Sequence, residues 1–148
     1  MKTLLKFLLT VLAALCCAAA PVFAHGKNEA GPNGGRLLTA VDPHVEFFVT
    51  KERKIQFTFL DAQDRPTAPA GQSVIVTTGS RAAPTVLTFT RQGDVLLSDA
   101  ALPAGNNLPA VIQLKPAPDA PEVVVKFNIN LATCGECSHA EYACICDH

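Results

Sequence analysis

Apolar and polar residues alternate at a period of two through most of segment 35–131, and no part of it keeps a helical period. Alternation of this kind is typical of strands that bury one face against a core. Turns rich in Gly, Pro, Asn and Asp separate the alternating runs about every ten residues. The expected strands cover residues 45–49, 54–61, 73–78, 85–91, 94–98, 110–115 and 123–131. The pattern therefore predicts an all-β domain.

Seven or eight short strands predict an antiparallel sandwich of the immunoglobulin-like kind, with a small barrel as the alternative. The sequence has no Trp, so the Cys-Trp-Cys signature of true immunoglobulin domains is missing. Only a short polar turn separates the first two expected strands, which indicates a hairpin, and Gln92-Gly93 is short enough for another hairpin turn. We expect the sandwich to occupy residues 36–132, after a flexible lead-in at residues 25–35.

The first 24 residues have the composition of a removable export signal. Lys2 and Lys6 give a positively charged start, and residues 7–20 form an almost uninterrupted apolar run that includes Cys16 and Cys17. This run is shorter than the roughly 20 residues that a spanning helix needs. We therefore expect a periplasmic or secreted protein without membrane insertion after cleavage; anchoring by an uncleaved leader is the alternative.

Without this leader, 148 − 24 = 124 residues remain, with 12 − 2 = 10 basic and 13 acidic side chains. The net charge of 10 − 13 = −3 provides no basic surface for nucleic-acid phosphates. Tyr142 is the only tyrosine, which also argues against stacking platforms for bases. No Ser/His/Asp set and no pair of carboxylates stands out from the loops. We expect neither a nucleic-acid partner nor an enzyme.

The four cysteines outside the leader all lie near the end of the chain, where the sequence reads Cys-Gly-Glu-Cys-Ser-His-Ala-Glu-Tyr-Ala-Cys-Ile-Cys-Asp-His. A Cys-x-x-Cys knuckle directs two sulfurs to one ion, and a second pair follows if Ile145 turns outward. Thiolates in this number suit tetrahedral zinc or copper(I). The segment 133–148 is therefore predicted to be a metal-binding tail, and its candidate ligands are Cys134, Cys137, Cys144, Cys146, His139 and His148.

The spacing within this tail differs from the usual zinc ribbon, because only six residues separate Cys137 from Cys144. A tail closed by disulfides is the alternative expected of an oxidising compartment. Thiol–disulfide exchange is the third possibility. Glu136 inside the knuckle should raise the thiol pKa, and no helix N-terminus is expected beside Cys134, so neither usual source of a reactive thiolate is visible.

Two histidines outside the tail are further candidate ligands. His25 would be the first residue after cleavage, so its amine and imidazole could chelate copper(II), with His44 as a third nitrogen. In the simpler interpretation, His25 is solvated in a mobile segment. His44, beside Glu46 on the polar face of a strand, would then have a surface or strand-pairing role.

The run Gly31-Pro32-Asn33-Gly34-Gly35-Arg36-Leu37-Leu38, followed by His44-Val45-Glu46, resembles small exported β-domains found in bacteria alongside heavy-metal efflux adaptor proteins. The resemblance extends over roughly residues 31–127 and does not include the Cys-rich tail. It implies an exported sandwich in a metal-handling context, with an efflux component as partner.

Together these features predict a periplasmic protein that buffers, stores or delivers zinc or copper through its tail. The alternative is an exported structural or interaction module whose tail is closed by disulfides or by a structural zinc.

Overall fold

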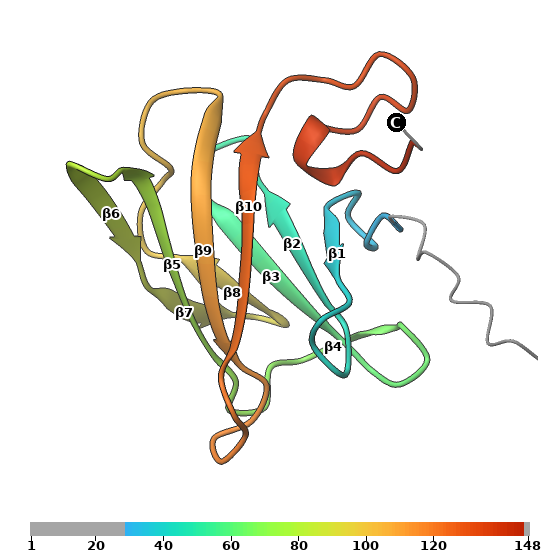
Figure 1. The fold of residues 1–148 in the computed structure, drawn as a ribbon. Helices are drawn as coiled ribbons and strands as arrows, with labels where there is room; N and C mark the ends of the chain where they lie inside the picture. The colour runs from blue at the N-terminus through green and yellow to red at the C-terminus, as the bar shows by residue number, and fades with distance from the viewer. Residues whose placement is uncertain (1–28, 147–148) are drawn as a thin grey trace, which may run out of the picture.

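The computed structural model describes residues 29–146 as two antiparallel sheets, one behind the other (Figure 1). The expected export signal, His25 and His148 lie outside the described residues. The first sheet has the order β1-β2-β3-β8-β7, with β4 paired to β3; its strands are β1 (Arg36–Leu38), β2 (Val45–Val49), β3 (Ile55–Leu60), β4 (Pro66–Thr67), β7 (Phe89–Gln92) and β8 (Val95–Ser98). The second has the order β10-β9-β5-β6; its strands are β5 (Ser73–Ser80), β6 (Ala83–Leu87), β9 (Asn107–Lys115) and β10 (Val123–Asn130).

The all-β, antiparallel prediction is confirmed, and the order of the strands is now defined. The series β2-β3-β8-β7 opposite β10-β9-β5 follows the ABED and GFC order of immunoglobulin-type sheets, with β6 added beside β5. The likeness is one of strand order alone. Apart from the strands, the described residues contain one short 3-10 helix, η1 (Glu141–Ala143), which lies in the tail.

Residues 29–146 form ten strands, where the sequence predicted seven or eight. Two of the extra strands, β1 and β4, are too short to show a period of two. A third arises because segment 85–91 divides at Thr88 into β6 and β7, which belong to different sheets. The Thr88 N–H and hydroxyl donate to the Asp99 carboxylate, at 3.1 and 2.9 Å, and this holds the chain at the crossing. The expected turn also shifts by one residue, since Gln92 pairs with Val95.

The core lies between the sheets and is built from the apolar faces that the alternation predicts. Phe47 on β2 and Phe57 on β3 are fully buried neighbours, with ring centroids 5.6 Å apart. Phe47 also meets Phe127 of β10 edge-on at 5.1 Å, so one aromatic contact joins the two sheets. Val76 on β5 and Ile112 on β9 complete this layer from the second sheet and are likewise fully buried.

The opposite face of β2 is covered as well, because the segment before β1 folds back over it. Glu46 on this face is 0% exposed, although its place in the alternation predicts a solvated side chain. The N–H groups of Asn33 and Gly35 each donate to Glu46 Oε1 at 2.8 Å, and the Asn33 side-chain amide donates to Oε2 at 2.6 Å. These hydrogen bonds satisfy the buried carboxylate and attach residues 31–35 to the sheet.

The glycines of this loop are explained by its close approach to β2. A Cβ at Gly31 would collide with the Glu46 side chain, and one at Gly35 would collide with the Phe47 carbonyl oxygen. Gly34 has φ of +80°, a conformation that side chains disfavour. The glycine-rich run and Glu46 are therefore two parts of one structural unit. The expected flexible lead-in is, over residues 31–35, a turn fixed by hydrogen bonds.

Replacing Glu46 by alanine is expected to destabilise the domain by about 2–4 kcal/mol, because buried N–H donors of the loop lose their acceptor. Glu46→Gln keeps one carbonyl acceptor and should cost less. Denaturant unfolding of both variants measures the difference, with exposed Glu52→Ala as the matched control. An alanine variant as stable as the Glu52 control would contradict this role of Glu46.

Candidate metal centre

The Cys-x-x-Cys knuckle follows β10 directly and forms a closed turn. Thr133 and Ala140 form an isolated antiparallel bridge across it. The Cys134 N–H donates to the His139 carbonyl at 2.8 Å, and the Ser138 N–H donates to the Cys134 carbonyl at 3.3 Å. Ser138 has φ of 62°, the left-handed conformation that reverses the chain here. The turn is thus built by the backbone.

The second cysteine pair is brought back to the knuckle by the short helix η1. The Glu141 N–H donates to the Ala132 carbonyl at 2.8 Å, and the Ala143 N–H donates to the Ala140 carbonyl at 2.8 Å. Tyr142 and Ala143 are 5% and 3% exposed and belong to the core of the sandwich. Cys144 follows immediately. Six residues between Cys137 and Cys144 are therefore enough to bring the second cysteine pair back beside the first. The chain between them packs against the core through Tyr142 and Ala143 and does not form a second hairpin.

The four sulfur atoms gather into one group whose members all lie within 4.8 Å of one another. The Sγ atoms of Cys144 and Cys134 are 3.3 Å apart. Cys137 and Cys144 are 3.6 Å apart, and Cys134 and Cys146 are 4.0 Å apart. Four sulfurs at 2.3 Å from a central zinc form a tetrahedron with edges of about 3.8 Å. The observed separations bracket this value, so the group could hold a metal ion.

No disulfide joins these four cysteines in the described part of the chain. Their sulfur separations also exceed the roughly 2.05 Å of a disulfide bond. Cys134 is 3% exposed, whereas Cys137, Cys144 and Cys146 are partly exposed. Ile145, between the last two, is 38% exposed, which is the outward orientation that the sequence required for a second pair.

Backbone N–H groups also point at the sulfurs. Hydrogen bonds from the N–H groups of Ile145 and His139 lower the pKa of Cys137 to about 6. The Cys146 N–H donates to Cys144 Sγ at 3.4 Å. Desolvation and the neighbouring thiols raise the pKa of Cys146. The pKa of Cys144 is raised too: the Cys146 N–H opposes the rise, but desolvation and the adjacent thiols outweigh it.

The low pKa of Cys137 differs from the expectation that Glu136 would raise the thiol pKa of the knuckle. Its cause is the two backbone donors, which only the folded tail brings to the sulfur. N–H donors of this kind stabilise negative charge on sulfur, whether the thiolate is bare or bound to a cation. These two donors therefore favour a thiolate at Cys137.

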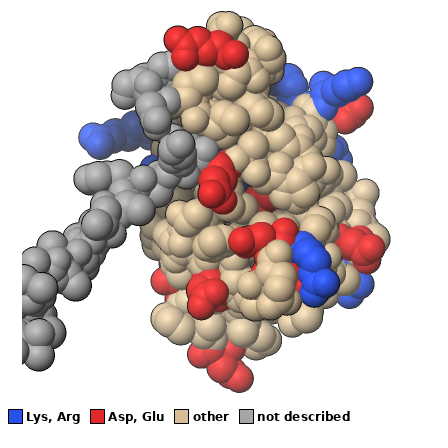
Figure 2. Space-filling model, turned by 90° about the vertical axis from the view of Figure 1, so that its right-hand side faces the viewer, with Lys and Arg blue, Asp and Glu red and all other residues tan. Residues whose placement is uncertain are grey.

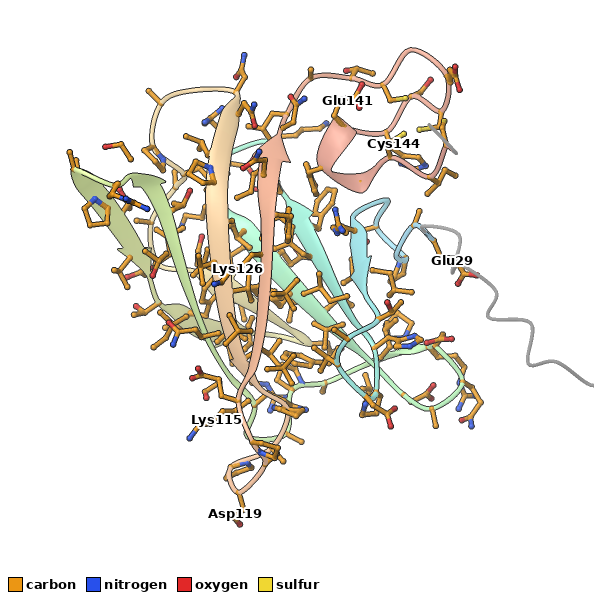
Figure 3. The ribbon with its side chains drawn as sticks, in the orientation of Figure 1. Glu29, Lys115, Asp119, Lys126, Glu141 and Cys144 are labelled. Carbon is orange, nitrogen blue, oxygen red and sulfur yellow. The ribbon has the colours of Figure 1, made fainter. Side chains whose placement is uncertain are left out.

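The charged side chains of the tail itself are acidic, although Arg36 of β1 approaches it at the Tyr142 carbonyl. Within residues 131–146, Glu136 and Glu141 are the only Asp, Glu, Lys or Arg side chains. Figure 2 shows the side of the molecule that carries the tail: acidic side chains are spread over it, whereas basic ones lie mostly toward its margins. Glu29, on the segment before β1, lies on this side as well (Figure 3). This charge distribution favours cations.

The histidines are placed differently from the cysteines. The group of four does not include His139, whose ring lies beside the loop before β1: a Cβ built on Gly34 would be 3.3 Å from His139 Nδ1. His139 also lines a hollow between the tail and the end of β2. His44 Nδ1 is 2.9 Å from Asp64 Oδ1 at the surface. The structure thus brings the cysteines together and leaves His139 and His44 outside their group.

Two residues that the sequence did not single out for the site hold the tail in place. The Tyr142 hydroxyl accepts the Val49 N–H at 2.9 Å, and burial raises the pKa of Tyr142. The Arg36 guanidinium lies 4.7 Å from the Phe127 ring centroid and donates from Nη1 to the Tyr142 carbonyl at 3.5 Å. Burial lowers the pKa of Arg36. The sequence offered one signal for this role, because Tyr142 is the only aromatic residue of the tail and could be expected to pack against the core.

The comparisons with known proteins do not place this chain. No protein-family model, no curated protein and no solved structure matches it. Among the residues that the structure describes, no helix has the length and apolar character needed to cross a membrane.

In reduced, metal-free protein, Cys137 should be alkylated by iodoacetamide with a midpoint near its pKa of about 6. Below this pH the thiol is protonated and is alkylated slowly, whereas above it the thiolate reacts quickly. Labelling of Cys144 and Cys146 should keep rising into alkaline pH, since their pKa values are raised. Mass-spectrometric sequencing of the labelled tail locates the adduct, and Cys137→Ser should lose the fast phase. A Cys137 midpoint near the ordinary value of about 8.5 would count against these donors.

Proposed function

We propose that this chain is an exported metal-binding protein of the periplasm, which holds a zinc ion in its tetra-cysteine group for buffering, storage or delivery. The observation that carries the proposal is the convergence of four sulfurs within 4.8 Å of one another, with no disulfide among them. Thiolates that converge in this way can bind one cation together, and metal coordination contributes free energy to the folding of such a segment.

Zinc is favoured over copper(I) by the number and arrangement of the ligands. Copper(I) and zinc both bind thiolates, but a tetrahedral set of four sulfurs is typical of zinc or iron. Zinc also has no redox chemistry, so an oxidising compartment does not change the oxidation state of the bound ion. Copper(I) is the second candidate cargo.

A carrier role is favoured over a purely structural metal by the position of the site. Three of the four thiols are partly exposed, so a competing ligand can reach the ion from solvent. The core that joins the strands, which contains buried Phe47 and Phe57, also includes Tyr142 and Ala143 of the tail but none of the four cysteines. The metal ion can therefore leave without unfolding the strands.

Export and an efflux partner are supported by the sequence. The leader has the pattern of an export signal, and the glycine-rich run with Glu46 resembles exported β-domains of heavy-metal efflux systems. A non-catalytic role agrees with four protein ligands, since catalytic zinc keeps one position for water or substrate. The His25 amine and imidazole remain a separate candidate site for copper(II).

Anaerobic purification without added metal tests the proposal. We expect one zinc per chain and, after chelation, four thiols that react with a thiol reagent. Cys144→Ser should lower zinc affinity at least about 100-fold, more than changes around a metal site usually cost. His139→Ala is the matched control in the same tail and should keep the stoichiometry. Two disulfides and no metal in fresh protein would support the structural module instead.

Exchange against a competing chelator separates carried from structural metal. We expect zinc to leave within the experiment while the far-ultraviolet circular dichroism of the strands stays unchanged. Loss of the β-sheet spectrum in step with zinc release would identify the ion as structural.

A further inference from the structure

The two halves of the tetra-cysteine group are attached to different parts of the sandwich. Cys134 and Cys137 follow β10 through the Thr133–Ala140 bridge. Cys144 follows Ala143, which is 3% exposed and belongs to the core. Figure 3 shows Cys144 on the return arm of the tail, beyond the helix that carries Glu141. The distance between the two cysteine pairs therefore depends on how η1 docks against the sheets.

Tyr142 makes the contacts that dock η1. Its ring meets Phe47 edge-on, with centroids 5.5 Å apart and planes at 84°. Its hydroxyl accepts the N–H of Val49, the last residue of β2, at 2.9 Å. Its hydroxyl is thus engaged on the side of the sheets.

The backbone of Tyr142 is held from the other side by Arg36 of β1. Arg36 Nη1 donates to the Tyr142 carbonyl at 3.5 Å, while the guanidinium stacks on Phe127 at 4.7 Å from the ring centroid. Cys144 is two residues from this carbonyl. Side chains of β1, β2 and β10 thereby fix where the second cysteine pair begins.

We propose that Tyr142 is a positioning residue of the metal centre, and that metal occupancy and stability of the sandwich are coupled through its docking. This inference rests on the proposed metal-binding function. If η1 were not docked, the second cysteine pair could move relative to the knuckle, and metal binding would first have to order this pair. Docked η1 presents both pairs together, which lowers the entropic cost of closing the site.

Thermodynamic linkage makes this coupling reciprocal. If docking of Tyr142 raises the affinity for metal, metal must raise the stability of the docked state by the same factor. Coupling of this kind typically amounts to about 5–150-fold in affinity. Zinc should therefore raise the melting temperature of the strands, although no strand residue is a ligand.

The decisive variant is Tyr142→Leu, which removes the edge contact with Phe47 and the acceptor of the Val49 N–H. Its control is Phe89→Leu on β7, at the far end of the strand order from β1, where the ring packs on Phe57 at 5.0 Å. Chelator competition should show at least about 10-fold weaker zinc binding for Tyr142→Leu. Phe89→Leu should stay within about twofold of wild type, as expected for a distant site.

Two further readouts exclude a merely structural effect. Zinc should raise the melting temperature of Phe89→Leu as much as that of wild type, and that of Tyr142→Leu clearly less. Cobalt(II), bound in place of zinc, should give altered thiolate charge-transfer bands in Tyr142→Leu alone. Unchanged zinc affinity, zinc-induced stabilisation and cobalt spectrum in Tyr142→Leu would overturn the proposal.

Tyr142→Phe decides the matter if the leucine variant fails to fold. It keeps the ring and removes only the hydroxyl, so zinc binding should weaken by about 2- to 10-fold, the usual worth of one hydrogen bond. Wild-type affinity in this variant, together with a leucine variant that does not fold, would also overturn the role. Failure of the proposed function itself is seen separately, as wild-type protein that binds neither zinc nor cobalt(II).

Discussion

The ring of Phe47 is the point at which the parts of this molecule meet. It makes edge-on contacts with three other aromatic rings, which belong to β3, to β10 and to the tail: Phe57, Phe127 and Tyr142. The first contact is within one sheet, the second joins the two sheets, and the third attaches the segment that carries the cysteines. Edge-on aromatic pairs add about 0.5–1.5 kcal/mol each beyond their buried area. The sandwich and its tail therefore share one core.

This shared core changes how the cysteine-rich tail is understood. The sequence predicts the tail as a metal-binding segment that follows the sandwich and is separate from it. In the structure, backbone hydrogen bonds and the buried Tyr142 hold both cysteine pairs in place. The ion would then complete a site whose framework is already attached to the strands. Such a site can combine tight binding with release, since the strands do not depend on the ion for their core.

Much of the fold could be predicted from the sequence, because a period of two determines which side chains face the core. What the period could not show is the sheet to which a strand belongs. Leu87 and Phe89 both face the same core, so the alternation continues smoothly while the chain crosses at Thr88 from one sheet to the other. Glu46 was placed on the polar face, and only the folded loop at residues 31–35 explains its burial.

The candidate site was predictable in its ligand types and not in its geometry. Four closely spaced cysteines indicate a metal centre by composition, and the structure brings all four together. His139 lies beside Gly34, which is far away in the sequence. The roles of Tyr142 and Arg36 likewise arise from long-range contacts, with Val49 and Phe127. Local spacing carries no information about such contacts.

X-ray absorption at the zinc edge, on protein isolated anaerobically from periplasmic extract without added metal, tests the central claim most directly. If the four cysteines of the docked tail hold the zinc, the first shell should consist of four sulfurs at about 2.3 Å. Protein that contains no zinc, or a first shell of nitrogen and oxygen, would contradict the account.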